Sequence, residues 1–350
     1  AIRRQRQMCI RDSNNTIQTE ETEKKQSLIS QILKIIIPLA LGVLILWFLY
    51  RDTDFDKMWV TIKDANWGIL ALSLIFGPLG NIIRGVRWKM LIEPLGYNPS
   101  KRSLIYSVLG SYAVNIAIPR GGEVWRCAMV AKGEKIPFTK LIGSMLLDRV
   151  SDTCTVACII LLACCFNVDV FLSYIRDNQA LSATIQNLYS SPWIIGGVIV
   201  AAIFIGLIFT VFKENKIVKK VLSIILGLLN DMKTIFKMKH KGRFLLYTIG
   251  IWVSYFLYFY ITFYAFDFTR HLGITAALIA FALSSLSMAI PTNGGIGVWH
   301  AAVVLSLGLY GVTKESGEAF AFVVFAVQNL WIVIIGLFSM FALSLKPSTK

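Results

Sequence analysis

Long apolar runs recur along the whole sequence, and they constrain the fold more than any other feature. Several runs reach the roughly 20 residues that an α-helix needs to cross a 30 Å hydrocarbon core. Only 16% of the 350 residues are charged, whereas an ordinary soluble domain carries about 25%. The sequence therefore predicts an all-α integral membrane protein, a polytopic helix bundle.

Charges between the apolar runs predict the topology. The loop 84–102 has a net charge of +4 and segment 213–243 a net charge of +7, whereas loop 51–64 has −1. Basic loops face the cytoplasm, so we expect a multi-pass protein of the cell (inner) membrane with both termini cytoplasmic. Two broken elements accompany the full spans, and an eight-span bundle is the alternative. The six full spans are expected at residues 32–50, 67–83, 141–166, 193–212, 244–266 and 319–345.

The two ends of the sequence are expected to lie outside the membrane domain. Residues 1–13 read AIRRQRQMCIRDS, which resembles translated sequencing-adapter sequence, so we expect them to be non-native. Residues 14–30 are polar and predict a disordered cytoplasmic tail. The transmembrane domain is expected at residues 31–345, followed by a cytoplasmic tail at residues 346–350.

Several functional classes find no support in the sequence. The net charge of +15 does not indicate nucleic-acid binding, because the basic residues lie between apolar runs. Apart from Cys9, the cysteines form no CxxC pair and the histidines are far apart, so we expect no metal site and no cofactor. No phosphate loop, nucleophile elbow or HExxH motif is present, and we expect no enzymatic activity.

Two segments interrupt apolar runs in a similar way. Residues 117–126 read AIPRGGEVWR and residues 289–300 read AIPTNGGIGVWH, with their prolines 172 residues apart. The flanking limbs are short, at residues 103–118 for the first break and at 274–290 and 296–310 for the second. On the charge-derived topology they predict two re-entrant elements that enter from opposite faces, which suggests an inverted repeat.

Broken helices at membrane depth survive only where protein or a wet cavity surrounds the backbone. Paired Pro/Gly breaks in corresponding halves are the usual sequence sign of a transporter's binding site. We therefore expect a shared polar cavity, and ordinary surface loops are the alternative. The candidate binding residues at the breaks are Asn115, Gly121, Gly122, Pro291, Asn293, Gly294 and Gly295.

Charged residues near the breaks extend the candidate site. Asp148 and Asp152 lie on one helical face at i, i+4 inside an apolar run, and Arg149 precedes Asp152 by three. We expect Asp152 to pair with Arg149 or with an arginine of the first break. A surplus of guanidinium groups suits a lipid phosphate, whereas a salt-bridge cluster that fastens helices is the alternative. The other charged or titratable candidates are Arg84, Arg87, Arg120, Glu123, Arg126 and His300.

An ordered set of short motifs supports a family resemblance. These motifs lie at residues 87–91 (RWKML), 115–119 (NIAIP), 122–126 (GEVWR), 148–152 (DRVSD) and 291–300 (PTNGGIGVWH). Together they resemble the transmembrane, flippase-like domain of lysylphosphatidylglycerol synthases, over residues 30 to 345. Family members often carry Glu where this chain has Asp148, which keeps the charge, and Glu where it has His300, which does not. Any role of that second Glu is in doubt here.

The resemblance implies lipid translocation or lipid handling. Because the sequence leaves no room for a soluble synthase domain after Lys350, we expect a stand-alone member that does not make lipid. The leading hypothesis is a flippase or lipid-binding transporter for an anionic or modified phospholipid, or for a lipid-linked headgroup. The alternatives are a non-transporting partner of a lipid synthase or glycosyltransferase and, less favoured, a membrane-embedded transferase. Membrane phospholipids are the expected partners, and the sequence does not decide whether the protein forms a homo-oligomer.

Overall fold

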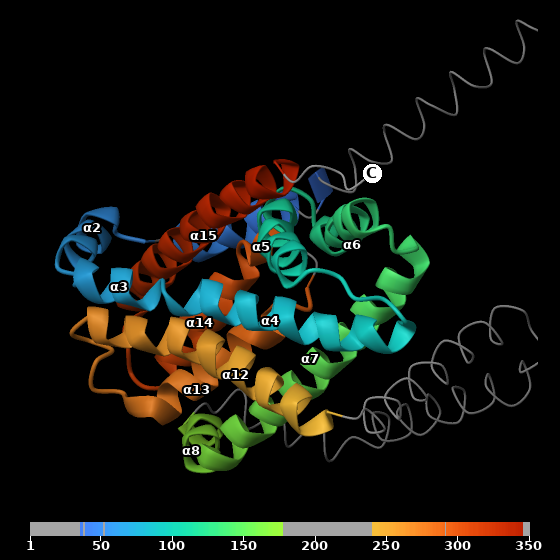
Figure 1. Cartoon of the computed structure of the whole chain (residues 1–350). Helices are drawn as coiled ribbons and strands as arrows, with labels where there is room; N and C mark the ends of the chain where they lie inside the picture. Colours follow the sequence, from blue (N-terminus) through green and yellow to red (C-terminus); the bar gives the residue numbers. More distant parts are fainter. Residues whose placement is uncertain (1–35, 38, 52, 178–239, 291, 346–350) are drawn as a thin grey trace, which may run out of the picture.

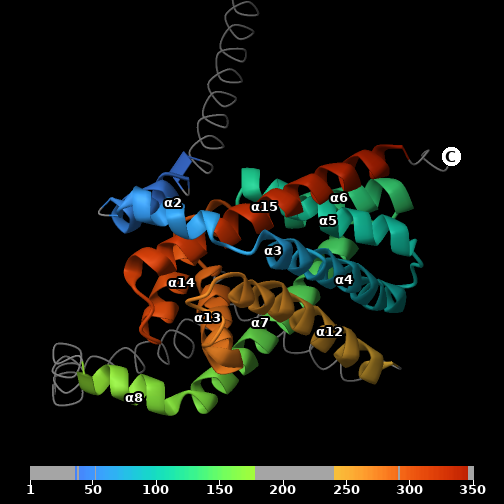
Figure 2. The same cartoon turned by 90° about the vertical axis from the view of Figure 1, so that its left-hand side faces the viewer.

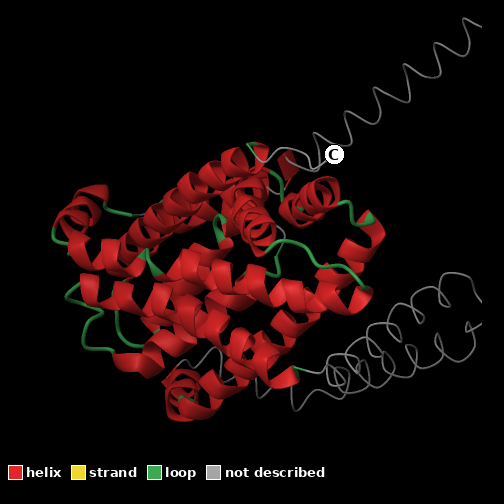
Figure 3. Ribbon diagram, viewed as in Figure 1, coloured by secondary structure: helices red, strands yellow, loops and turns green. Residues whose placement is uncertain are grey.

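The computed structural model is built entirely of helices in the residues it describes, which are 36–37, 39–51, 53–177, 240–290 and 292–345 (Figure 1, Figure 3). Four helical segments are long and apolar enough to cross a membrane, namely Trp67–Leu95, Phe138–Phe166, Lys241–Ala265 and Lys314–Ser344. Two shorter apolar helices, Leu39–Tyr50 and Gly273–Ser287, accompany them. The chain is therefore a polytopic membrane helix bundle, as the apolar runs predict.

The predicted full spans and the structure agree where they can be compared, except at the end of the second span. The expected span 193–212 lies outside the described residues, and the expected span 32–50 is described only from residue 36. The labelled elements are α2 (Phe55–Lys63), α3 (Trp67–Ser73), α4 (Phe76–Ile92), η1 (Glu93–Leu95), α5 (Lys101–Ala117), α6 (Gly121–Glu134), α7 (Phe138–Phe166), α8 (Val168–Asp177), α12 (Lys241–Tyr260), η2 (Ile261–Ala265), α13 (Gly273–Ser287), η3 (Asn293–Gly295), α14 (Val298–Gly308) and α15 (Lys314–Ser344).

The prediction that the second span ends at residue 83 is wrong. The helix α4 continues through Arg84 and Arg87 to Ile92, and both arginine side chains are buried. A charge in an apolar run looks like the end of a span because a bare charge is costly in the membrane. Here carboxylates of α7 compensate the arginines, so the helix continues.

Helices α4 and α12 pack closely along one another because glycines line their interface (Figure 2). A Cβ at Gly77 would lie 2.8 Å from the ring of Tyr258, and a Cβ at Gly80 would lie 2.6 Å from the ring of Tyr255. At one end of the pair, the carbonyl of Ala265 accepts a hydrogen bond from the backbone N–H of Asn66, which caps α3. Close approach of small residues is the common way for membrane helices to associate.

The first break forms a tight hairpin between α5 and α6. The α5 helix ends ahead of Pro119, and Arg120 adopts a left-handed conformation with φ of 58°. A Cβ at Gly122 would overlap the carbonyl oxygen of Ser111, so only glycine lets α6 approach α5 here. The side chain of Asn115 accepts a hydrogen bond from the backbone N–H of Gly122 at 2.8 Å.

The second break forms the corresponding hairpin between α13 and α14. Gly294, Gly295 and Gly297 all have positive φ, of 60°, 84° and 83°. Such angles favour glycine, which explains why the run of glycines turns the chain between two short apolar helices. Pro291 itself lies outside the described residues.

The two halves of the bundle pack reciprocally, as an inverted repeat requires. Each hairpin is followed by a long apolar helix, α7 of 29 residues in the first half and α15 of 31 residues in the second. The α7 helix of the first half packs on α13 of the second hairpin, and α15 of the second half packs on α5 of the first hairpin. The equivalent helices α4 and α12 pack on each other. Exchanging the two halves therefore leaves this pattern of contacts unchanged, which supports the predicted repeat.

Candidate functional site

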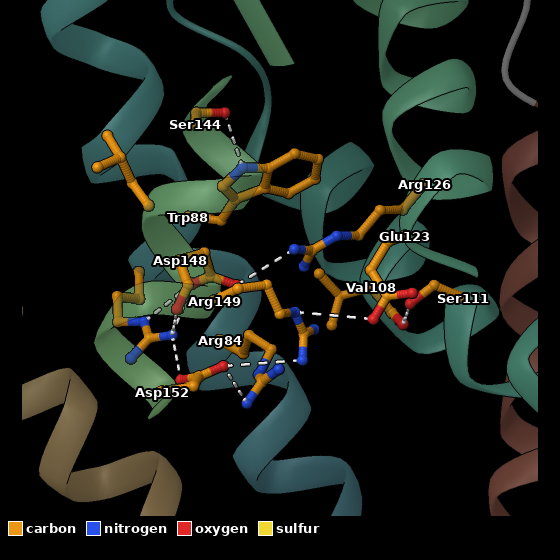
Figure 4. Close-up of polar contacts among 12 residues, drawn as sticks. Arg84, Trp88, Val108, Ser111, Glu123, Arg126, Ser144, Asp148, Arg149 and Asp152 are labelled. Carbon is orange, nitrogen blue, oxygen red and sulfur yellow. Dashed lines mark hydrogen bonds and ion pairs between the residues drawn. The ribbon is translucent and has the colours of Figure 1, made fainter. Parts of the chain in front are cut away.

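The α4 helix presents a stripe of buried polar residues toward α7. Asn81, Arg84 and Arg87 recur every three residues, and their exposed fractions are 2%, 3% and 0%. Opposite them, α7 carries Asp148 and Asp152, which are also buried. As the i, i+4 spacing predicts, both carboxylates face the same side of α7 and meet the arginines (Figure 4).

Each nitrogen of the Arg87 guanidinium donates a hydrogen bond to another side chain of the protein. Its Nε and Nη2 donate to Oδ1 of Asp148 at 3.1 and 2.6 Å, and Nη2 also reaches Oδ1 of Asp152 at 2.7 Å. Its Nη1 donates to Oγ1 of Thr248 on α12 at 3.1 Å. Because every nitrogen of this guanidinium is engaged, Arg87 ties α4, α7 and α12 together.

Arg84 pairs with Asp152, with its Nη2 at 2.9 Å from Oδ2. Arg149, the neighbour on α7, is 3.9 Å from the same oxygen. The prediction that Asp152 pairs with Arg149 is confirmed by this contact, and the shorter contacts of Asp152 come from Arg84 and Arg87 of α4. Helix crossing decides this pairing, because α4 passes directly over the carboxylate face of α7.

Arg126 reaches the cluster from α6, the second limb of the first hairpin. Its Nη2 donates to Oδ2 of Asp148 at 3.2 Å, and its guanidinium lies 4.6 Å from the ring centre of Trp88. Trp88 is itself fixed by a hydrogen bond from its Nε1 to Oγ of Ser144 at 3.0 Å. The aromatic face supplies a cation–π contact and leaves much of the guanidinium without an acceptor.

A more accessible ion pair lies at the edge of the cluster. Nε of Arg149 is 3.7 Å from Oε1 of Glu123, and the two side chains are 38% and 19% exposed. Figure 4 shows Glu123 and Arg126 arriving from the same helix on one side, with Arg149 between them and the aspartates. Since Arg149 and Glu123 cancel, they do not change the net charge of the site.

The buried cluster has a surplus of positive charge and unused donors. Arg84, Arg87 and Arg126 face Asp148 and Asp152, which leaves a net charge of +1. Nε and Nη1 of Arg84 and of Arg126 are buried and have no hydrogen-bond partner within the described part of the chain. Buried charges and donors without partners are costly. These unpaired N–H groups are donors of the kind that an anion would require.

The tips of the two hairpins contact each other. Nη2 of Arg120 donates to the carbonyl of Ala289 at 3.2 Å, and Nδ2 of Asn293 donates to the carbonyl of Ala117 at 3.3 Å. Each carbonyl lies two residues before the proline of its own break. The last carbonyl groups of a helix have no partner within that helix. Each break thus supplies a donor to one such carbonyl at the other break.

A cavity of about 280 Å³ lies between α4 and the second half of the bundle. Tyr255 lines it and also contacts the charged cluster, because the guanidinium of Arg84 lies 5.6 Å from its ring centre. Met288 lines it on the side of the second break, where a Cβ at Gly295 would lie 2.6 Å from its sulfur. The cavity therefore lies between the cluster and the second break.

Most of the predicted site residues fall into two groups, and one residue, His300, lies elsewhere. The charged group holds Arg84, Arg87, Glu123, Arg126, Asp148, Arg149 and Asp152, and the hairpin tips hold Asn115, Arg120, Gly121, Gly122, Asn293, Gly294 and Gly295. The structure does not bring His300 to the charged group. That residue is buried among Tyr50, Trp299 and Phe325 instead.

Sequence reasoning missed four residues that complete the site, namely Asn81, Ser144, Thr248 and Tyr255. The three-residue spacing of Asn81, Arg84 and Arg87 was a usable signal, because it places all three on one helix face. The other three look like ordinary polar or aromatic residues of a membrane helix. No cluster of three potential metal ligands occurs among the described residues.

A bundle of apolar helices with an internally paired charge cluster, two helix breaks that meet at their tips and a cavity between the cluster and the second break defines a polytopic membrane protein. Residues 35–336 match the model of the lysylphosphatidylglycerol synthase transmembrane region. The chain belongs to this family, which the motif order in the sequence already indicates.

The chain is similar to two archaeal proteins. A UPF0104 membrane protein of Methanocaldococcus jannaschii is 28% identical over 126 residues, which cover 35% of this chain and 38% of the relative. The glycosyltransferase AglD of Haloferax volcanii is 21% identical over 350 aligned residues, which cover 92% of this chain and 56% of the relative. The match thus spans little more than half of the longer relative. These relationships mark a membrane protein related to lipid or glycolipid metabolism.

Proposed function

We propose that this chain is a lipid flippase or lipid-binding transporter that holds the phosphate of an anionic or modified phospholipid or of a lipid-linked headgroup. The observation that carries the proposal is the buried cluster with a net charge of +1 and four guanidinium nitrogens that have no hydrogen-bond partner in the described part of the chain. Ionisable groups inside a membrane bundle are usually functional and paired. A phosphate would supply the missing charge and the missing acceptors.

The three arginines have different roles in this proposal. Arg87 is fully bonded to Asp148, Asp152 and Thr248 and acts as the structural anchor. Arg84 and Arg126 each keep Nε and Nη1 without a hydrogen-bond partner among the described residues, and an N–H group of a charged guanidinium makes a strong hydrogen bond to a phosphate oxygen. The lipid phosphate is therefore assigned to Arg84 and Arg126.

The hairpin tips support transport rather than simple storage. Only two side-chain-to-backbone hydrogen bonds, from Arg120 and from Asn293, join the tips among the described residues. Two hairpins that enter from opposite faces and meet in the middle can open one at a time. Separating the tips would expose the cluster to one side of the membrane and then to the other.

A second candidate is a non-transporting partner of a glycosyltransferase or lipid synthase. The favouring observation is that the relative over 92% of this chain is named a glycosyltransferase. In that case the cluster would present a lipid to another protein and would not move it across the bilayer. Liposomes that contain only this chain separate the two candidates, because a presenting partner does not accelerate lipid exchange between leaflets.

The proposed setting is the cell membrane with the basic loops in the cytoplasm. Single cysteines at Lys135 and Asp267, in a background without the native cysteines, test the orientation with a membrane-impermeant thiol reagent. Lys135 follows α6 and Asp267 follows η2, so only the second is expected to react in intact cells. Labelling of the Lys135 position from outside would reverse the proposed orientation.

Reconstituted vesicles test the function directly. Purified full chain is placed in liposomes with fluorescent phosphatidylglycerol, and an impermeant quencher reports how fast inner-leaflet lipid becomes accessible. Arg84→Lys and Arg126→Lys keep the charge but lose the fork, so we expect both to stay folded and to slow exchange by roughly tenfold, the equivalent of about 1.4 kcal/mol. Arg270→Lys, at an exposed pair with Asp267, is the matched control and should exchange lipid at the wild-type rate.

Arg87→Lys separates the anchor from the binding residues. Because a lysine cannot reproduce the fork that joins Asp148, Asp152 and Thr248, we expect loss of thermal stability first. Wild-type exchange rates in well-folded Arg84→Lys and Arg126→Lys proteins would leave the cluster a scaffold only. No exchange by the wild type would favour the partner candidate.

A further inference from the structure

The cavity beside Arg84 has an unusual lining for a membrane protein. It is walled by aromatic side chains, among them Trp252, Tyr255 and Phe281, together with the amide side chains Gln328 and Asn329. None of its lining residues is Asp, Glu, Lys or Arg. A cavity of about 280 Å³ with a few placed polar groups among aromatic walls matches the general form of small-molecule sites.

The polar groups of the lining include both free donors and free acceptors. Nε1 of Trp252 is buried and has no acceptor among the described residues. Nε2 of Gln328 donates to the carbonyl of Tyr258 at 2.7 Å, and Nδ2 of Asn329 donates to the carbonyl of Phe325 at 2.8 Å. These bonds fix the orientation of both amides and leave Oε1 of Gln328 and Oδ1 of Asn329 as acceptors for a ligand.

This combination selects a ligand rich in hydroxyl groups. A hydroxyl is at once donor and acceptor, whereas an ammonium only donates and a carboxylate only accepts. An ammonium would also leave the Trp252 donor unused and would find no carboxylate in the lining. The aromatic walls suit the C–H face of a saturated ring, so the lining matches a sugar or another ring polyol.

The cavity is joined to the phosphate site through α4 and Tyr255. The hydroxyl of Tyr255 donates to Oδ1 of Asn81 at 2.5 Å, and Asn81 lines the cavity one turn before Arg84. The guanidinium of Arg84 lies 5.6 Å from the ring centre of Tyr255. The cavity lining therefore adjoins Arg84 through Asn81 and Tyr255.

We propose that the cavity takes the uncharged, hydroxyl-rich headgroup, a sugar or ring polyol, of a lipid whose phosphate is bound by Arg84 and Arg126. The proposal rests on the proposed lipid-handling function and names its substrate class. It predicts discrimination by headgroup hydroxyls at constant phosphate charge. It also predicts that a lysyl headgroup gains nothing from the cavity.

Native mass spectrometry of the purified full chain measures this preference. The protein is titrated with lipids that share the same acyl chains and carry ethanol, glycerol, inositol or lysyl-glycerol on the phosphate. We expect phosphatidylinositol to bind roughly tenfold more tightly than phosphatidylethanol, on the order of one or two net hydrogen bonds. Phosphatidylglycerol should lie between them, and its lysyl derivative should bind no better than phosphatidylglycerol itself.

Two conservative variants assign the preference to the cavity. Trp252→Phe removes one donor but keeps an aromatic wall, and Asn329→Leu removes one acceptor at similar volume. Each should lower the inositol-to-ethanol affinity ratio by roughly threefold to tenfold and leave phosphatidylethanol binding unchanged. Trp59→Phe on α2, an exposed tryptophan outside the cavity, is the matched control and should keep the wild-type ratio.

The outcomes separate this inference from the function on which it rests. A wild-type protein that binds all four lipids equally would overturn the hydroxyl-rich headgroup and leave the phosphate site standing. A preference for inositol that both cavity variants retain would also overturn it, because the selectivity would then arise elsewhere. Failure to bind any of the anionic lipids would reject the phosphate site itself, and with it the proposed function.

Discussion

Arg126 and His300 occupy matching places in the two halves of the bundle, yet their surroundings are opposite in kind. Each follows a Val-Trp pair just after a Pro/Gly break and lies in the second limb of a hairpin. Arg126 meets a carboxylate of Asp148 at 3.2 Å. His300 meets the ring of Phe325, with 4.3 Å between ring centres, and its Nδ1 has no partner in the part of the chain that is described.

The difference shows that the same hairpin arrangement surrounds a charged side chain in one half and an aromatic contact in the other. In the first half, α7 answers the arginines with Asp148 and Asp152 and leaves a net positive charge. In the second half, α15 presents the ring of Phe325 to His300 in the equivalent region. The first half thus supplies the charge cluster, and the second half supplies most of the aromatic wall of the cavity beside it.

Of the substitutions that test this comparison, Asp148→Ala should cause the largest loss of stability. It leaves Arg87 and Arg126 buried without their shared carboxylate, and loss of one partner of a buried pair costs about 3–5 kcal/mol. Thermal melting in detergent measures the effect. Asp267→Ala, whose side chain is 91% exposed in its pair with Arg270, should melt close to wild type. Equal melting temperatures for the two variants would mean that the cluster contributes little to stability.

Gly122→Ala should be the next largest effect. The added Cβ overlaps the backbone carbonyl of Ser111, and a rigid backbone must move, so we expect a loss of about 1–3 kcal/mol. At Gly295 the added Cβ meets the flexible end of Met288 and a positive φ, so Gly295→Ala should cost only about 1–2 kcal/mol. Gly143→Ala, with open space around it, serves as the control. A larger loss at Gly295 than at Gly122 would contradict the tighter packing of the first hairpin.

The hydrogen bonds between the hairpin tips should have smaller and similar contributions. Asn293→Ala and Arg120→Met each remove one bond, worth about 0.5–1.5 kcal/mol. Because the two bonds are reciprocal, we expect both variants also to accelerate lipid exchange in vesicles. Slower exchange in the well-folded variants would argue against opening at the tips.

His300→Phe should have the smallest effect. It replaces an imidazole without a described Nδ1 partner by a ring that suits Tyr50, Trp299 and Phe325. Stability should stay within about 1 kcal/mol of wild type, since no hydrogen bond at Nδ1 is lost. A loss of more than about 2 kcal/mol in the melting experiment would show that His300 has a polar role matching that of Arg126.

The sequence predicted the helix breaks, the charged residues and the repeat because each leaves a local mark. Pro119 with Gly121 and Gly122 interrupts an apolar run, and Asp148 with Asp152 places charges inside one. The positions of these residues along the chain are enough to identify them. Membrane helices allow few alternatives to a hairpin once such a break occurs.

The pairing of charges and the cavity could not be predicted in the same way. Which arginine faces Asp152 depends on how α4 crosses α7, and the sequence of neither helix states that angle. Trp252 and Tyr255 lie on α12, and Gln328 lies on α15, far away in the sequence. From sequence alone, the aromatic residues of α12 cannot be told apart from a run that faces lipid. Only the packed bundle shows that these side chains line one cavity.

Distance measurement by solid-state NMR tests the central claim most directly. The full chain with ¹⁵N-labelled arginine is reconstituted in vesicles of phosphatidylinositol, and magnetisation dephasing between lipid ³¹P and guanidinium ¹⁵N is recorded. We predict dephasing that corresponds to direct hydrogen bonds, with N–O distances of about 2.7–2.9 Å, and we predict that the double variant Arg84→Lys with Arg126→Lys abolishes it while Arg270→Lys does not. Absence of ³¹P–¹⁵N dephasing in the wild type, or its persistence in the double variant, would contradict the account.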